Sequence, residues 1–345
     1  MSGPFTLSLQ VDNLIPRGDP EETRAIIELW TSAQAHLQNK PFEVQDPGSG
    51  KSLSFTLSLK ADAALGLMNA VRSQFGSFNA ARRERATHAD MTLGAVLAVE
   101  LAAAPDDTSL LGTYHAASVF FQQLYLALNL ALPGACQLLA TRFIGEQAHR
   151  FESQNFDASA FYDARASALE QTWPPLSTLD FVSVWAWLER TGNCESNTAV
   201  TPINKVLIDL LKVGQQQNAQ SARTALLVAN QIELLLGTHR DEDLRTARQR
   251  ASLIFGPPPE AADGFKVLFQ LRQALFKGAH PVRRPALVYH SPEDETVGLL
   301  KPHNSGVERS FAVILALLQQ LIKENAQAYR FSESLTIDSF NAGEV

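Results

Sequence analysis

The residues best suited to chemistry gather in one basic segment, residues 240–284. It carries nine basic and five acidic side chains, a net charge of +4 within a chain of 345 residues whose formal net charge is −7. Such a segment could face the phosphates of a nucleic acid, and it could equally be a solvated helix face. The bases that we expect at a phosphate-facing surface are Arg245, Arg248, Arg250, Arg283 and Arg284.

The sequence lacks the residue patterns that other common chemistries need. Residues 48–52 read Gly-Ser-Gly-Lys-Ser, like the end of a phosphate-binding loop, but that motif needs glycine where this chain has Gln45. A strand pattern follows instead of a helix, so we expect a hairpin turn there. The eight histidines lack metal-ligand spacing, and Cys136 and Cys194 have no nucleophile signature. We therefore expect no metal site and no cofactor.

Several stretches resemble the Apea-like branch of the HEPN superfamily. Residues 224–237, TALLVANQIELLLG, precede a basic helix at 244–253, a Pro-rich turn and residues 265–278, FKVLFQLRQALFKG. In the family, a helix that ends in Leu-Glu-x-Leu-x-Gly precedes a basic helix and an Arg-Ser-x-x-x-His-Gly segment. Residues 179–188, LDFVSVWAWL, also resemble the family, so the likeness covers roughly residues 175–330.

This resemblance implies a helical, often dimeric domain that acts on RNA without a metal. Active members use an Arg to hold phosphate and a His, four to six residues later, to take the proton from the ribose 2′-OH. Arg272 matches the Arg, but Lys277 stands where the His is expected. A free lysine, with a pKa of about 10.4, is a poor base at neutral pH. His280 could act instead if Gly278 and Pro281 end the helix and the chain folds back.

The same residues allow a structural interpretation. Lys277, Gly278 and Pro281 are typical of an ordinary helix end, and Arg272 could pair with Glu233, which we expect to be a structural partner. Two functions therefore stay open. One is an RNA-directed protein, a candidate metal-independent endoribonuclease with an altered Arg-x4-Lys motif, in a prokaryotic antiviral defence or stress system. The other is a non-catalytic module that forms a homodimer, docks a protein of such a system or senses a ligand.

Hydrophobic periodicity predicts the elements that position these residues. Alternation predicts strands at 5–11, 55–59 and 93–101, with helices at 20–38 and 61–75. After residue 108, apolar residues three and four apart predict helices at 114–132, 135–150, 179–190, 202–213, 222–236, 264–277 and 307–329. We expect a mainly α fold, in which a smaller α/β portion precedes a HEPN-like helical bundle.

These elements suggest four parts: an α/β portion at 1–108, a helical connector at 109–172, the HEPN-like domain at 173–331 and a polar tail at 332–345. Hydrophobic residues make up 45% of the chain and charged residues 19%, which excludes a fully disordered protein.

Two further patterns bear on location and packing. Gln122, Gln123, Asn129 and Pro133 interrupt the most apolar stretch, residues 116–139, so we expect a buried core helix, no membrane span and a cytoplasmic protein. Two tryptophans spaced by two on the helix at 179–190 point in different directions. We expect them to pack in the core and not to stack bases.

Overall fold

Alternating apolar residues build a five-stranded antiparallel sheet in the N-terminal part of the chain. The computed structural model describes residues 5–11, 14, 20–46, 48–77, 95–103, 110–144, 148–194, 197–215, 222–238, 244–280 and 295–332. The strand order is β2-β3-β4-β1-β5. The strands are β1 (Phe5–Val11), β2 (Lys40–Gln45), β3 (Ser52–Lys60), β4 (Ala95–Ala103) and β5 (Arg142–Ile144).

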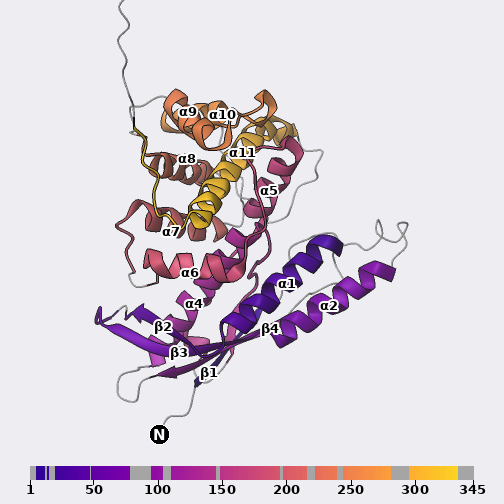
Figure 1. Ribbon diagram of the computed structural model, residues 1–345, viewed down its shortest axis with the longest axis vertical. Coiled ribbons are helices and arrows are strands. Elements are labelled where there is room, and N and C mark those ends of the chain that lie inside the picture. The colour runs from indigo at the N-terminus through magenta and orange to yellow at the C-terminus, as the bar shows by residue number, and fades with distance from the viewer. Residues whose placement is uncertain are drawn as a thin grey trace, which may run out of the picture.

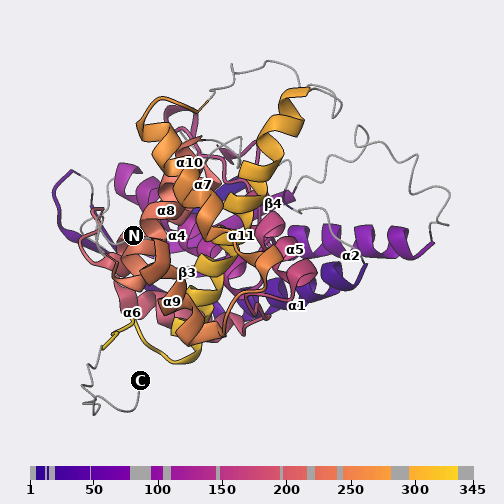
Figure 2. The same ribbon diagram turned by 90° about the horizontal axis from the view of Figure 1, so that it is seen from above.

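The three predicted strands are confirmed as β1, β3 and β4. In β3, side chains of period two face the core: Leu53, Phe55, Leu57 and Leu59 are all buried. Helices α1 (Pro20–His36) and α2 (Asp62–Ser77) lie side by side and pack against β3 and β4 (Figures 1 and 2). These two helices confirm the predicted helices at 20–38 and 61–75.

A tight turn joins β2 to β3, where the sequence resembled a phosphate-binding loop. The Asp46 carboxylate accepts hydrogen bonds from the backbone N–H groups of Gly48 (3.3 Å) and Ser49 (3.2 Å) and from the Ser49 hydroxyl (2.6 Å). Gly50 adopts a φ of +70°, which suits glycine. The predicted hairpin turn is therefore confirmed.

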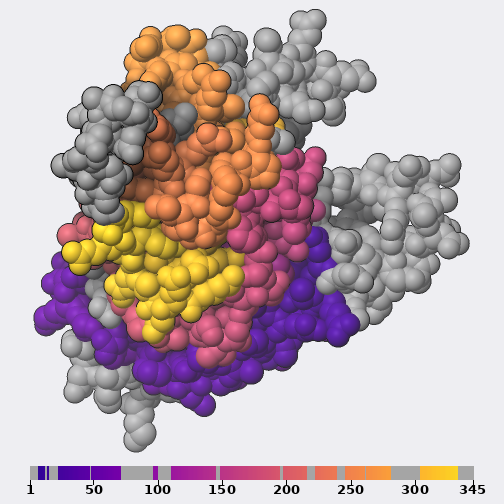
Figure 3. Space-filling view, turned by 45° about the horizontal axis from the view of Figure 1, so that its top comes forward, coloured from indigo at the N-terminus to yellow at the C-terminus, as the bar shows by residue number. Residues whose placement is uncertain are grey.

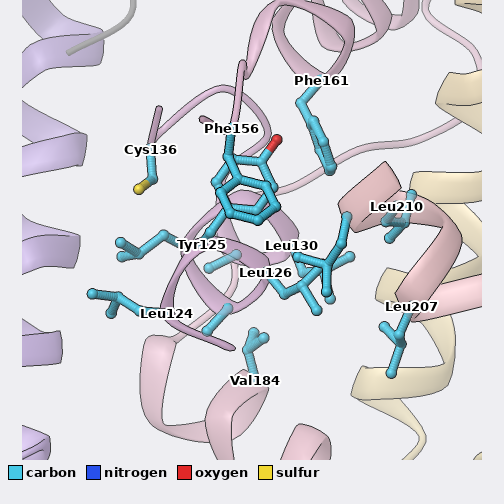
Figure 4. Close-up of a cluster of buried hydrophobic side chains, with 14 of the residues drawn as sticks. Leu124, Tyr125, Leu126, Leu130, Cys136, Phe156, Phe161, Val184, Leu207 and Leu210 are labelled. Atoms are coloured by element: carbon cyan, nitrogen blue, oxygen red, sulfur yellow. The ribbon is translucent and has the colours of Figure 1, made fainter. Parts of the chain in front are cut away.

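Helix α4 (Leu110–Ala131) joins the sheet to the helices that follow. Every residue from 123 to 131 is buried, because α4 packs on β2, β4 and α1 and also on α6, α7 and α11. Tyr125 on α4 lies 5.1 Å from Phe156 and 5.7 Å from Phe161 between ring centroids. These side chains belong to one buried hydrophobic cluster that also contains Val184 and Leu207, which lie around the same helix (Figure 4). The predicted buried helix within residues 116–139 is confirmed.

In the described part of the chain, seven further helices form the bundle. The longest, α11, packs against α5, α8 and α10 (Figure 1). By length and composition, the segment Asn304–Lys323 of α11 could cross a membrane. However, 78% of its apolar 18-residue stretch is buried inside the protein. The bounds are α5 (Ser159–Gln171), α6 (Phe181–Thr191), α7 (Pro202–Gly214), α8 (Ala222–Leu236), α9 (Leu244–Phe255), α10 (Phe265–Phe276) and α11 (Glu295–Lys323). The described part of the chain is therefore mainly helical, with a smaller N-terminal sheet, as predicted.

The helix predicted over residues 135–150 is wrong. After α4, the Asn129 side chain accepts hydrogen bonds from the N–H groups of Gly134 (3.1 Å) and Cys136 (3.3 Å), which fixes a turn. The chain then enters β5, which pairs with β1, and a single 3-10 turn at Ala148–Arg150. Sheet pairing overrides the local three- and four-residue spacing here. Strand β2 and helix α5 were not predicted.

The two tryptophans of α6 pack in the core, as predicted. Trp185 and Trp187 are 1% and 0% exposed. Their indole N–H groups point to different partners, the Glu189 carboxylate at 2.7 Å and the Ala326 carbonyl at 2.6 Å. Neither ring is available as a platform for bases.

Candidate functional site at the end of helix α8

Helices α9 and α10 both pack on α8, and they bring two of the candidate bases, Arg250 and Arg272, to its C-terminal end. Helix α8 ends at Leu236 because Gly237 adopts a left-handed φ of +64°. In the space-filling view, residues of α9 and α10 (orange) form the top of the visible surface (Figure 3). The described candidate residues therefore belong to one end of the bundle.

Arg272 on α10 forms an ion pair with Glu233 on α8. The Arg272 and Glu233 side chains are 18% and 11% exposed, so water screens the pair only partly. The Arg272 guanidinium also lies 5.7 Å from the ring centroid of Phe269 and 5.9 Å from that of Phe276. The ion pair between Arg272 and Glu233, which the structural interpretation of the sequence predicted, is therefore present.

Arg250 and Arg248 on α9 also contact protein groups. The Arg250 guanidinium donates to the carbonyls of Leu236 (2.9 Å) and Gly237 (2.8 Å), which α8 leaves without helical partners. It also lies 5.1 Å from the ring centroid of Phe331. Arg248 pairs with Asp263 at 2.8 Å. Two of the predicted RNA-binding arginines thus stabilise the fold.

The structure describes only one of the other three predicted RNA-binding residues. Arg245 is exposed near the start of α9 and has an interaction partner within the protein. Arg283 and Arg284 lie outside the described residues. The basic segment is therefore partly neutralised by contacts within the protein.

Lys277 and His280 lie at the end of α10. The Lys277 N–H donates to Gln273 O (3.0 Å), and Gly278, at φ +66°, donates to Leu275 O (3.1 Å). The N–H of Ala279 donates to the carbonyl of Ala274 (2.8 Å), a bond typical of a helix that ends at a left-handed glycine. The predicted helix end is confirmed. The Lys277 side chain is exposed and the His280 side chain is half-buried.

This arrangement can hold a phosphate at Arg272 only if the phosphate displaces the Glu233 carboxylate or joins it. Among the described residues, no three histidine, cysteine or acidic side chains gather to bind a metal ion. Two small pockets among the described residues lie elsewhere, one of them lined by Asp163, Thr224 and Glu308. Arg272, Lys277 and His280 thus occupy surface and helix-contact positions.

Sequence reasoning missed two features of this site. Phe269 and Phe276 stand three residues before and four residues after Arg272, a helical spacing that could have revealed them as its neighbours. The contact of Arg250 with two carbonyls had no sequence signal, because it depends on how α9 crosses the end of α8. Comparison of the chain with protein-family models, curated proteins and solved structures gives no match. The likeness to HEPN proteins thus rests on the sequence motifs alone.

Proposed function

We propose that this protein is a non-catalytic helical module that forms a homodimer through the surface of α9 and α10. In this proposal Arg272 holds α10 on α8 and has no catalytic role. The observation that carries the proposal is the ion pair between Arg272 and Glu233, because it occupies the cation that a nuclease would direct at a phosphate.

Exposed apolar side chains on the same two helices support self-association. Leu253 on α9 is 78% exposed and Phe276 on α10 is 72% exposed. Aromatic side chains such as that of Phe276 are more frequent at protein interfaces than elsewhere on the surface. Phe276 also lies against the guanidinium of Arg272, which restricts its motion and suits it to the centre of a contact.

The oligomeric state tests this proposal directly. We expect wild-type protein to sediment as a dimer at micromolar concentration, and Phe276→Ser or Leu253→Ser to shift it toward monomer by at least tenfold in Kd. Leu169→Ser on α5 is the matched control, since Leu169 is also exposed, at 58%, but lies on another helix. A wild-type protein that stays monomeric at these concentrations would overturn the proposal.

A second candidate function is the RNA-directed one, a metal-independent endoribonuclease of the HEPN kind. The observation that favours it is the helix end at Lys277 and Gly278, because His280 therefore does not continue along the axis of the helix that carries Arg272. In this mechanism Arg272 would bind the phosphate and His280, or Lys277, would take the 2′-OH proton.

RNA cleavage in EDTA distinguishes the two functions. We expect no cleavage of total RNA by the wild type at equimolar concentration. Cleavage that survives EDTA and disappears in His280→Ala or Lys277→Ala, with the circular dichroism spectrum unchanged, would establish the nuclease. Both substitutions are suitable because neither residue belongs to the core.

A further inference from the structure

His36 occupies an unusual position between the sheet portion and the bundle. It is the last residue of α1, and its ring meets Phe181, the first residue of α6, edge to face, with 6.2 Å between ring centroids. Its Nε2 is buried and has no hydrogen-bond partner among the described residues. A neutral imidazole tolerates this placement when Nε2 carries no proton, because this nitrogen then lacks only a hydrogen bond that it could accept.

Three charged groups act on His36. Lys40 belongs to β2, Glu189 belongs to α6, and Asp180 is the residue that caps the start of α6. Burial, followed by the charge of Lys40, lowers the pKa of His36 below its ordinary value of 6.5, while Glu189 and Asp180 act in the opposite direction.

Both carboxylates already have partners. Asp180 caps α6 by accepting hydrogen bonds from the N–H (2.9 Å) and the hydroxyl (3.0 Å) of Ser183. Glu189 accepts the indole N–H of Trp185. A protonated His36 would carry a buried N–H without an acceptor, so it must compete for one of these carboxylates or leave the interface.

We propose that His36 is an acid-sensitive latch between α1 and α6, closed when the imidazole is neutral and released when it is protonated. Release would loosen the contact between the sheet portion and the bundle, because α1 also packs on β3 and α4. The proposal is independent of the function proposed above, since His36 lies far along the chain from α9 and α10.

The direction of the pH effect follows from the lowered pKa. The unfolded chain binds the proton more readily than the folded protein, so the latch stabilises the fold fully above pH 6.5 and less as the pH falls below that value. Because the unfolded imidazole titrates near its ordinary pKa of 6.5, its protonation can raise the unfolding constant by at most about 30-fold between pH 7.5 and 5.0.

Urea unfolding at pH 7.5 and pH 5.0 tests the latch. The wild-type unfolding constant should rise, on acidification, by up to about 30-fold more than that of His36→Gln, which cannot titrate. His149→Gln is the matched control, since His149 is exposed on the 3-10 turn, and it should follow the wild type. His115, whose Nε2 is also buried without a partner among the described residues, is present in every variant, so its effect cancels.

Equal acid responses of wild type and His36→Gln would overturn the proposal. A second measurement covers the case in which His36→Gln does not fold. In the wild type, the NMR titration of the His36 ring should give a pKa below 6.5, accompanied by a change in the indole N–H signal of Trp185. A His36 pKa at or above 6.5 would also overturn the latch.

Discussion

Gly214, the last residue of α7, leaves no room for a side chain. A Cβ atom at this position would lie 2.5 Å from the hydroxyl oxygen of Tyr125, 2.9 Å from its Cζ and 3.1 Å from its Cε1. Tyr125 is fully buried, and its hydroxyl donates to the carbonyl of Asp157 at 2.7 Å. The N–H of Asp157 in turn donates to the carbonyl of Gly214 at 2.6 Å. The glycine thus belongs to a small network that ties α4 to the end of α7.

We expect Gly214→Ala to destabilise the protein by about 1–5 kcal/mol. Overpacking a core contact costs about 1–3 kcal/mol, and a displaced Tyr125 hydroxyl leaves a buried carbonyl unpaired at a further cost of about 1–3 kcal/mol. The higher helix propensity of alanine offsets about 1 kcal/mol. Burial raises the pKa of Tyr125, so the side chain stays a hydroxyl and a hydrogen-bond donor at neutral pH.

Urea unfolding, followed by tryptophan fluorescence, measures this loss. Gly66→Ala on the exposed face of α2 is the control, because a Cβ there meets nothing within 4 Å and should stabilise the protein by about 1 kcal/mol. In the double variant Gly214→Ala with Tyr125→Phe, removal of the hydroxyl should recover part of the loss, so the two effects are not additive. The reasoning is refuted if Gly214→Ala is as stable as Gly66→Ala.

Three further predictions concern polar side chains. The amide of Gln231 is fully buried and has no partner among the described residues, so Gln231→Met should raise the free energy of unfolding by about 1–3 kcal/mol in urea melts; a loss would show that the amide holds a water or ligand. Asn129 makes four buried hydrogen bonds, so Asn129→Leu should lower the free energy of unfolding by about 2–5 kcal/mol, and unchanged stability would contradict this. Hydrogen bonds from the Ser49 hydroxyl and then the Gly48 N–H lower the pKa of Asp46 below its ordinary value of 3.8. Their stabilisation is complete above pH 3.8 and is lost as the pH falls through that lowered pKa; Asp46→Ala should remove this acid response from amide exchange in the turn, and an unaltered response would exclude Asp46.

The sequence predicted the helices and strands whose patterns lie within a few neighbouring residues. Pro20 followed by two acids marked the start of α1, and alternating residues marked β1 and β3. Strand β2 escaped prediction because it contains Pro41, and a proline within a short apolar segment argues against a strand. The helix expected at 135–150 failed because β5 finds its partner, β1, about 130 residues away in the chain, and no local pattern encodes that pairing.

The residues of the candidate site also divide into those whose position the sequence predicted and those whose contacts it did not reveal. Lys277 and Gly278 lie at the helix end that their types predict, and Glu233 is close enough in α8 for Arg272 to reach. Which acid an arginine meets depends on the crossing of two helices, so the sequence could offer this pair only as one alternative. The contact between Arg250 and the carbonyls of α8 depends on backbone geometry, which residue types do not reveal.

The strand order places β2 and β5 at the two edges of the sheet, and this limits how copies of the chain can associate. An open edge strand can pair with another molecule and extend the sheet from copy to copy. Here β5 is only three residues long, and β2 carries Pro41, which has no N–H to donate, between Lys40 and Phe42. Neither edge therefore offers a long ladder of backbone groups to a second copy. Polymerisation through the sheet is therefore disfavoured.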